Sequence, residues 1–254
     1  MLDSGGACGV LLEAQAITVR FGGLTAVDEA DVQVRAGELI GIIGPNGAGK
    51  TTFFNVLSGV IAPTSGRIVV DGNDVTGARP HRYVARGIAR TFQTPRVFAE
   101  LDVAANVDFG LQFAGRGRSG PPALKDATAI LELIGLGRHA SLPAAAITPS
   151  QQRLLEIGMA LATRPRLLLL DEVAAGLTEN EVENTAQLIR RLRSELGLTV
   201  IWIEHAVTTL MRHVERVLVL HQGRKLADGA PADVVRNSEV VEAYLGDEML
   251  EAAA

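Results

Sequence analysis

A glycine-rich turn between an apolar strand and a helix constrains this chain more than any other feature. The run Gly44-Pro45-Asn46-Gly47-Ala48-Gly49-Lys50-Thr51 fits the pattern G-x-x-x-x-G-K-S/T and directly follows the apolar stretch Leu39–Ile43. Glycines let the backbone curl so that successive N–H groups face a polyphosphate, and the following helix N-terminus adds positive potential. The pattern therefore predicts a strand, a phosphate-binding loop and a helix in direct succession.

Two side chains of this loop have separate predicted tasks. Lys50 would reach the β- and γ-phosphates of a nucleotide, and the Thr51 hydroxyl would bind Mg²⁺. A tight glycine-rich turn without a ligand would leave both residues unexplained. The residues expected to bind ATP are Gly44, Pro45, Asn46, Gly47, Ala48, Gly49, Lys50, Thr51 and Thr52.

A second apolar run, Leu167–Leu170, ends in the adjacent carboxylates Asp171 and Glu172. Asp171 would help to bind Mg²⁺, whereas Glu172 would orient the attacking water, because phosphoryl transfer mostly needs positioning and charge stabilisation. An acidic pair at a strand end is often a solvated turn. Its combination with the phosphate loop favours the catalytic interpretation.

The remaining pattern predicts an α/β fold. Paired β-rich stretches cover 11–34, helix-like stretches cover about 94–164, and Thr178 with Glu181 forms a capping box before another helix. Buried strands and helices alternate around these segments, as in parallel sheets. We expect a P-loop NTPase (RecA-like) core with a mostly parallel sheet, an N-terminal antiparallel β subdomain and an inserted α-helical subdomain. The expected boundaries are a single domain at 11–246, with tails at 1–10 and 247–254.

Composition limits the classes of function. Hydrophobic residues make up 47% of the 254 residues, enough for a full core, but no apolar run approaches the ~20 residues that cross a bilayer. A formal charge of −5 predicts no broad basic surface for nucleic acid. The N-terminal segment lacks the basic start of a secretory signal, and Cys8 has no partner cysteine, so we expect a cytoplasmic protein.

Four motifs together carry a family resemblance. The phosphate loop, Arg90-Thr91-Phe92-Gln93, Asp171-Glu172 and Glu204-His205 occur in the order and rough spacing of ABC ATPases, so the chain resembles that family over nearly its whole length. The stretches GIARTFQTPRVFAELDVAANV and VVEAYLGDEML are similar to the ATP-binding subunits of branched-chain amino acid importers.

The resemblance implies further site residues. Gln93 would sense Mg²⁺ and the attacking water and couple them to a permease contact, and His205 would contact the γ-phosphate. Glu172, His205 and Gln93 would then be the catalytic set, and Thr51, Gln93 and Asp171 the metal set. Phe21 lies where the family places an aromatic ring against adenine, although a core aromatic is the alternative interpretation.

The signature segment of the family departs from its usual Leu-Ser-Gly-Gly-Gln. This chain has Ile147-Thr148-Pro149-Ser150-Gln151, where the family contacts the γ-phosphate of ATP held by the other subunit. Thr148 as N-cap, Pro149 at N1 and Gln151 completing a capping box predict a helix start. Pro149 has no N–H and Ser150 adds a side chain, so both lost and weakened phosphate binding remain open.

By this resemblance the chain would be a Mg²⁺-dependent ATPase subunit, peripheral on the inner face of the membrane, that powers import of branched-chain amino acids. Its cofactors would be ATP and Mg²⁺. Its partners would be transmembrane permease subunits, a second ABC ATPase subunit in a homo- or heterodimer and, indirectly, a solute-binding protein. The alternatives are another cargo (urea, amides or lipid), or a regulatory subunit that binds ATP but hydrolyses it weakly. A soluble repair or translation protein is disfavoured, because the chain has one nucleotide domain and no basic tract.

Overall fold

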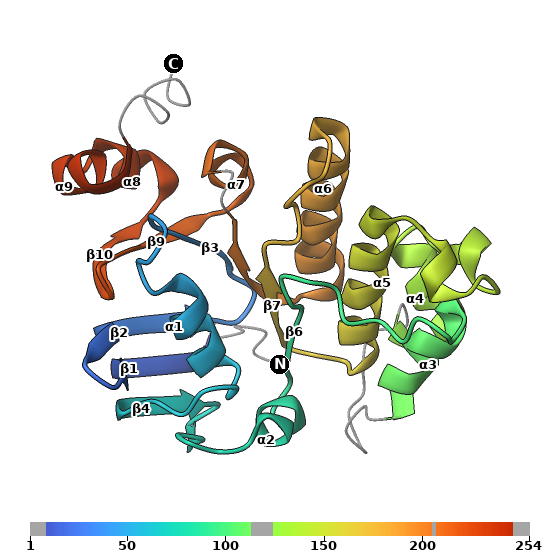
Figure 1. The fold of residues 1–254 in the computed structure, drawn as a ribbon, viewed down its shortest axis with the longest axis horizontal. Coiled ribbons are helices and arrows are strands. Elements are labelled where there is room, and N and C mark those ends of the chain that lie inside the picture. Colours follow the sequence, from blue (N-terminus) through green and yellow to red (C-terminus); the bar gives the residue numbers. More distant parts are fainter. Residues whose placement is uncertain (1–8, 113–123, 205–206, 246–254) are drawn as a thin grey trace, which may run out of the picture.

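The computed structural model describes residues 9–112, 124–204 and 207–245, and two β-sheets organise them (Figure 1). The larger sheet has the strand order β10-β9-β3-β8-β7-β6, in which β10 is an antiparallel edge and the other neighbours are parallel. Its strands are β3 (Leu39–Ile43), β6 (Ile88–Arg90), β7 (Leu167–Asp171), β8 (Thr199–Ile203), β9 (Arg216–His221) and β10 (Arg224–Gly229).

The central strands of this sheet are buried on both faces. In β3, Leu39 and Ile43 belong to one hydrophobic core, whereas Ile40 and Ile42 belong to the other. Strands β7, β8 and β9 divide their side chains in the same way, because successive residues of a strand point to opposite faces. Helices cover both faces, which explains why these strands are continuous apolar runs.

The smaller sheet is antiparallel, with the order β2-β1-β4-β5. Its strands are β1 (Val10–Phe21), β2 (Leu24–Arg35), β4 (Ser65–Val70) and β5 (Asn73–Asp74). Gly22 adopts φ 59° in the turn between β1 and β2. Helix α1 (Lys50–Leu57) packs in the core that this sheet shares with the larger one, so both sheets fix the helix that begins at the phosphate loop.

A helical subdomain lies to the right of the larger sheet in Figure 1. It comprises α3 (Val103–Gln112), α4 (Ala127–Leu133) and α5 (Pro149–Ala162), with 3₁₀ turns at Gly137–His139 and Ala144–Ala146. Residues 91–102, which include the start of the expected helical subdomain, are irregular. The buried amide of Asn106 on α3 holds part of this segment, since it accepts from the Phe98 N–H at 2.7 Å and donates to the Phe98 carbonyl at 3.1 Å.

The other helices are α2 (Pro80–Ala85), α6 (Glu179–Leu196), α7 (Val207–His213), α8 (Pro231–Arg236) and α9 (Ser238–Val240), followed by a π-helical turn at Val241–Leu245. The predicted capping box before α6 is confirmed: the Glu181 N–H donates to the Thr178 hydroxyl, and the Glu181 carboxylate accepts from the Thr178 N–H. Within the three described ranges, none of the helices combines the length and apolar character that a bilayer crossing requires.

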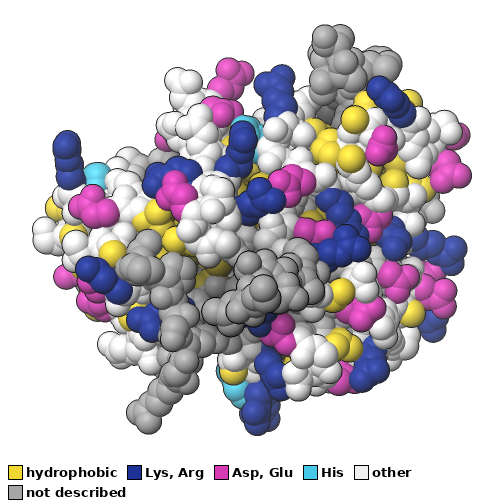
Figure 2. Space-filling view, turned by 180° about the vertical axis from the view of Figure 1, so that it is seen from behind, with side chains coloured by type: hydrophobic (Ala, Val, Ile, Leu, Met, Phe, Trp, Pro, Cys, Tyr) yellow, Lys and Arg dark blue, Asp and Glu magenta, His cyan; other side chains and the backbone are white. Residues whose placement is uncertain are grey.

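Charges of both signs are mixed on the face that Figure 2 shows. Figure 2 shows Lys and Arg interspersed with Asp and Glu on the described part of the back face, with small groups of hydrophobic side chains between them. Ion pairs elsewhere in the described structure include Arg67 with Asp74 at 2.7 Å and the less exposed Arg216 with Asp228 at 2.6 Å. Exposed pairs such as Arg67–Asp74 contribute little to stability, so the fold depends mainly on its two cores.

One glycine of the larger sheet allows a helix to approach closely. A Cβ atom on Gly41 would lie 2.2 Å from Cδ2 of Leu210 on α7, whereas a Cβ on Gly229 at the sheet edge would meet no atom within 4 Å. We predict that Gly41→Ala lowers the free energy of unfolding by about 1–3 kcal/mol through overpacking, and that Gly229→Ala changes it by less than about 0.5 kcal/mol. Urea denaturation of both variants tests this, and equal unfolding free energies would contradict the packing argument.

Candidate active site

Two glycines let the phosphate loop pass between neighbouring backbones. Gly44 adopts φ 154°, and a Cβ there would lie 2.1 Å from the Leu220 carbonyl oxygen of β9. Gly49 adopts φ 94°, and a Cβ there would lie 2.4 Å from the Ala26 carbonyl oxygen of β2. Larger residues would clash with rigid backbone, so these glycines position the loop between the two sheets.

The Lys50 ammonium is held by its own loop. Its Nζ donates to the Gly44 carbonyl at 2.5 Å and to the Pro45 carbonyl at 3.2 Å, and the residue is 6% exposed. Burial lowers the pKa of Lys50, while the nearby Glu172 carboxylate opposes this shift. The Lys50 ammonium is therefore held beside the backbone N–H groups of the loop before a nucleotide binds.

Residues from distant parts of the sequence line one pocket at this loop. The predicted residues Phe21, Gln93 and Glu172 line it together with Leu24, Thr25, Ala26, Asn46, Gly47, Ala48, Gly49, Lys50, Thr51 and Thr52. Phe21 is 51% exposed, which rules out the alternative that its ring belongs to the core. Gly44 and Pro45 do not line the pocket and instead hold Lys50.

The catalytic candidates Gln93 and Glu172 contact each other across this pocket. Gln93 Nε2 donates to Glu172 Oε2 at 2.7 Å, although 79 residues separate them. Glu172 has a left-handed backbone with φ 50°, which costs a non-glycine residue about 1–2 kcal/mol. Its N–H donates to the Ile203 carbonyl at 3.0 Å and its carbonyl accepts from Arg153 at 2.7 Å, so hydrogen bonds on both sides hold this conformation.

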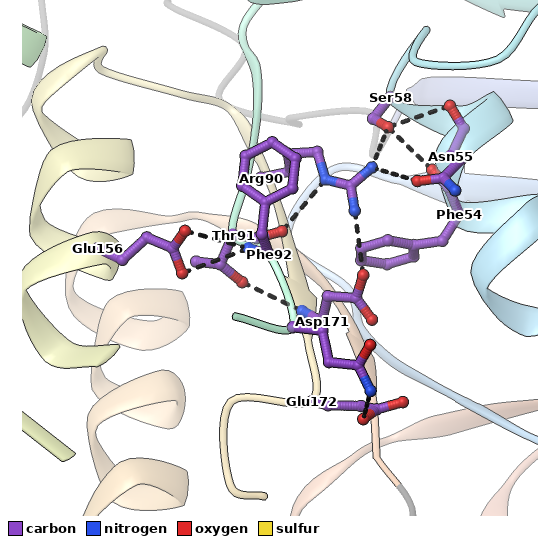
Figure 3. Close-up of polar contacts among 10 residues, drawn as sticks. Phe54, Asn55, Ser58, Arg90, Thr91, Phe92, Glu156, Asp171 and Glu172 are labelled. Carbon is purple, nitrogen blue, oxygen red and sulfur yellow. Dashed lines mark hydrogen bonds and ion pairs between the residues drawn. The ribbon is translucent and has the colours of Figure 1, made fainter. Parts of the chain in front are cut away.

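Arg90, on β6, connects Asp171 to helix α1 (Figure 3). Its guanidinium contacts five side chains: Asp171 at 3.0 Å, Asn55 at 2.7 Å, Ser58 at 2.9 Å, and the ring centroids of Phe92 at 4.6 Å and Phe54 at 5.4 Å. Burial lowers the pKa of Arg90, and the Asp171 charge opposes that shift. Asp171 is 2% exposed and its N–H donates to the Thr91 hydroxyl at 3.1 Å, so the carboxylate has a fixed position.

The oxygen donors at the site fit a magnesium ion held jointly with a nucleotide. Mg²⁺ usually takes one or two carboxylates together with substrate phosphates and waters. Thr51 supplies a hydroxyl at the pocket and Asp171 a buried carboxylate, although Asp171 itself does not line the pocket. Among the described residues, no group of three or more His, Cys, Asp or Glu side chains could hold a metal unaided.

The signature segment lies apart from the phosphate loop of its own chain. Thr148, Ser150 and Gln151 line a second pocket with Leu177 and Glu181. The predicted helix start is confirmed: Pro149 is at N1, Gln151 N–H donates to the Thr148 hydroxyl at 3.3 Å, and the Gln151 side chain accepts from the Thr148 N–H at 2.9 Å. His205 lies outside the described residues.

Sequence reasoning assigned no role to four charged side chains at the site. Arg90 binds the Asp171 carboxylate, and Arg153 binds the Glu172 carbonyl. Glu204 accepts from the N–H of Ala174, two residues after Glu172, at 2.7 Å. Glu156 accepts from backbone N–H groups on both sides of Gln93. A signal for Glu156 was its place between Leu155 and Ile157 in an apolar stretch of α5, where a charge is unusual.

The fold and the site define an ATP-binding cassette with a P-loop core. The chain belongs to the ABC transporter family: the model described as "ABC transporter" matches residues 27–175, and that described as "Branched-chain amino acid ATP-binding cassette transporter" matches residues 224–249. The family resemblance inferred from the four sequence motifs is confirmed.

Relatives and solved structures agree with this assignment. The chain is 40% identical to the high-affinity branched-chain amino acid transport ATP-binding protein BraF of Pseudomonas aeruginosa, over 93% of this chain and 98% of the relative. It is 38% identical to the corresponding LivG protein of Escherichia coli, with the same coverage. The structure of a nucleotide-free ATP-binding cassette from an ABC transporter superposes with a TM-score of 0.82 at 29% identity, covering 94% of this chain and 100% of that chain. The predicted fold class is thereby confirmed.

The buried Glu156 carboxylate should make stability depend on pH. Burial raises its pKa from 4.5 to about 7, although the Arg96 and Phe92 N–H groups and the charges of Arg153 and Arg96 act in the opposite direction. Between pH 4.5 and 7 the folded chain binds more protons than the unfolded chain, so the free energy of unfolding falls as pH rises.

In the wild type, ionisation of Glu156 should lower the free energy of unfolding by about 3 kcal/mol between pH 4.5 and 7. We predict that Glu156→Gln lacks this decrease, because the amide does not titrate. Urea denaturation of both proteins at several pH values isolates this contribution as the difference between the two curves. Parallel curves for wild type and variant would contradict the assignment.

Proposed function

We propose that this chain is the ATP-hydrolysing subunit of a membrane importer for branched-chain amino acids. The observation that carries the proposal is the contact between Gln93 and Glu172 at 2.7 Å, at the same pocket as the phosphate loop and Lys50. The proposed solutes are branched-chain amino acids, because the relatives BraF and LivG are named as ATP-binding proteins of branched-chain amino acid transport.

The residues of the pocket would share the tasks of phosphoryl transfer. Lys50 and the N–H groups of the loop would bind the phosphates, and the exposed ring of Phe21 would stack on adenine. Glu172 would orient the attacking water with help from Gln93. Mg²⁺, held with Thr51 and Asp171, would neutralise phosphate charge, and His205 would contact the γ-phosphate.

A groove beside the Gln93 segment is suited to a permease subunit. It is largely apolar and lies between the helical subdomain and the larger sheet, with Val60, Phe98 and Phe109 each at least 40% exposed. Large exposed apolar groups of this kind usually mark an interaction surface. We propose that a transmembrane permease subunit binds here, which would keep the chain peripheral on the cytoplasmic face of the membrane and associate it indirectly with a solute-binding protein.

A second ATPase subunit would complete the assembly. Thr148, Pro149, Ser150 and Gln151 begin α5 away from the phosphate loop of their own chain, so we propose that they meet the nucleotide of the other subunit. The absence of an N–H at Pro149 supports a second candidate, an ATP-binding regulatory subunit with weak hydrolysis. The rate of hydrolysis with the partner subunits present distinguishes the two candidates.

Two substitutions separate binding from hydrolysis. Lys50→Ala should abolish Mg²⁺-dependent ATP binding, because the preorganised cation of the loop is lost.

Glu172→Gln should leave ATP binding intact and slow hydrolysis at least about 100-fold, because the amide keeps the shape of the side chain and loses the charge that orients water. Equilibrium binding of ATP and single-turnover hydrolysis are the measurements. Unchanged affinity in the first variant, or an unchanged rate in the second, would refute the assigned role.

A further inference from the structure

Glu156 holds the turn that carries Gln93, and Figure 3 shows its contact with the backbone of Phe92, the residue before Gln93. The residue lies on α5 and is 6% exposed. Both of its carboxylate oxygens accept from the Phe92 N–H at 3.3 Å, and Oε1 also accepts from the Arg96 N–H at 3.0 Å. These two N–H groups lie on either side of the three residues 93–95. The carboxylate therefore fixes both ends of the short turn that presents the Gln93 amide.

The same helix also holds Glu172. Arg153, one turn before Glu156, donates to the Glu172 carbonyl at 2.7 Å. Residues three apart lie on the same face of a helix, so α5 presents one cation to the Glu172 backbone and one anion to the Gln93 turn. Helix α5 thus supports both partners of the Gln93–Glu172 hydrogen bond.

We infer that Glu156 is a positioning residue for Gln93, and that it makes the placement of Gln93 beside Glu172 depend on the position of α5. The inference rests on the proposed ATP hydrolysis at this site. Thr148, the N-cap of α5, lies about 12 Å along the helix axis from Glu156, so movement of the signature segment carries Glu156 with it. Glu156 also lines the groove proposed for the permease.

The charges around Glu156 support a role beyond filling space. The positive charges of Arg153 on the same helix and Arg96 on the turn stabilise its carboxylate. The negative charge of Glu156 in turn stabilises the Arg90 guanidinium on β6. Burial still outweighs these cations and raises the pKa of the carboxyl to about 7. A buried carboxylate is costly for a protein, whereas an apolar residue would pack the same place without that cost.

The test compares four variants of the full chain with its partner subunits present. Glu156→Ala removes both acceptors, Glu156→Asp withdraws the carboxylate by one methylene, and Glu156→Gln keeps one acceptor oxygen within reach of both N–H groups. Gln152→Ala is the matched control, because it deletes a different hydrogen bond of α5, from Gln152 to the Ala144 carbonyl at 2.9 Å. Steady-state ATP hydrolysis is measured at pH 8, where Glu156 is ionised.

We expect Glu156→Ala and Glu156→Asp to lower kcat about 10- to 100-fold, because the Gln93 amide would be displaced from Glu172. The KM for ATP should stay within about twofold of wild type. Glu156→Gln should recover most of kcat, and Gln152→Ala should match wild type. The separation of kcat from KM is expected because the phosphate loop is untouched, whereas general loss of structure would change both.

Unchanged kcat in Glu156→Asp, or a parallel change in kcat and KM, would overturn the inference. If Glu156→Ala fails to fold, the Asp and Gln variants still decide the question. Wild-type hydrolysis that Lys50→Ala does not reduce would instead refute the proposed function, and with it the inference.

Discussion

The close approach of the phosphate loop to the backbones of β9 and β2 is the constraint on which the rest of the site depends. Gly44 and Gly49 allow it, because a Cβ at either position would overlap a carbonyl oxygen. The loop then begins α1 between the two sheets, and the Lys50 ammonium turns back onto the carbonyls of Gly44 and Pro45. The position of the cation is thus set by backbone contacts before any nucleotide binds.

The second half of the site is held by buried or half-buried charged side chains on β6 and α5. Arg90 pairs with Asp171, Arg153 binds the carbonyl of Glu172, and Glu156 binds the turn around Gln93. Buried ion pairs contribute little net stability, since desolvation offsets attraction, but their directional hydrogen bonds fix geometry. The role of these groups is therefore to place Asp171, Glu172 and Gln93, while the two apolar cores supply stability.

Much of this arrangement could be predicted from the sequence. Strands β3, β7, β8 and β9 are continuous apolar runs because the sheet is covered on both faces, and the capping boxes at Thr148 and Thr178 are local patterns. Lys50, Gln93 and Glu172 were predicted from motif and resemblance, and the structure brings them to one pocket.

The rest depends on contacts between distant residues. Strand β6 has three residues and is recognisable only by its pairing with β7, and β10 is a largely polar edge strand. The segment before α3 is irregular, and part of it is held by Asn106, which binds the backbone at Phe98. The roles of Arg90, Arg153 and Glu156 follow from hydrogen bonds across 81, 19 and 64 residues, which no local pattern records.

Solute uptake by vesicles that contain this chain together with the proposed permease subunits and solute-binding protein is the most direct test of ATP-driven import. Leucine, isoleucine or valine should accumulate only when ATP and Mg²⁺ are supplied on the side of this chain. Accumulation that does not require ATP, or ATP hydrolysis that drives no uptake of these amino acids, would contradict ATP-driven import.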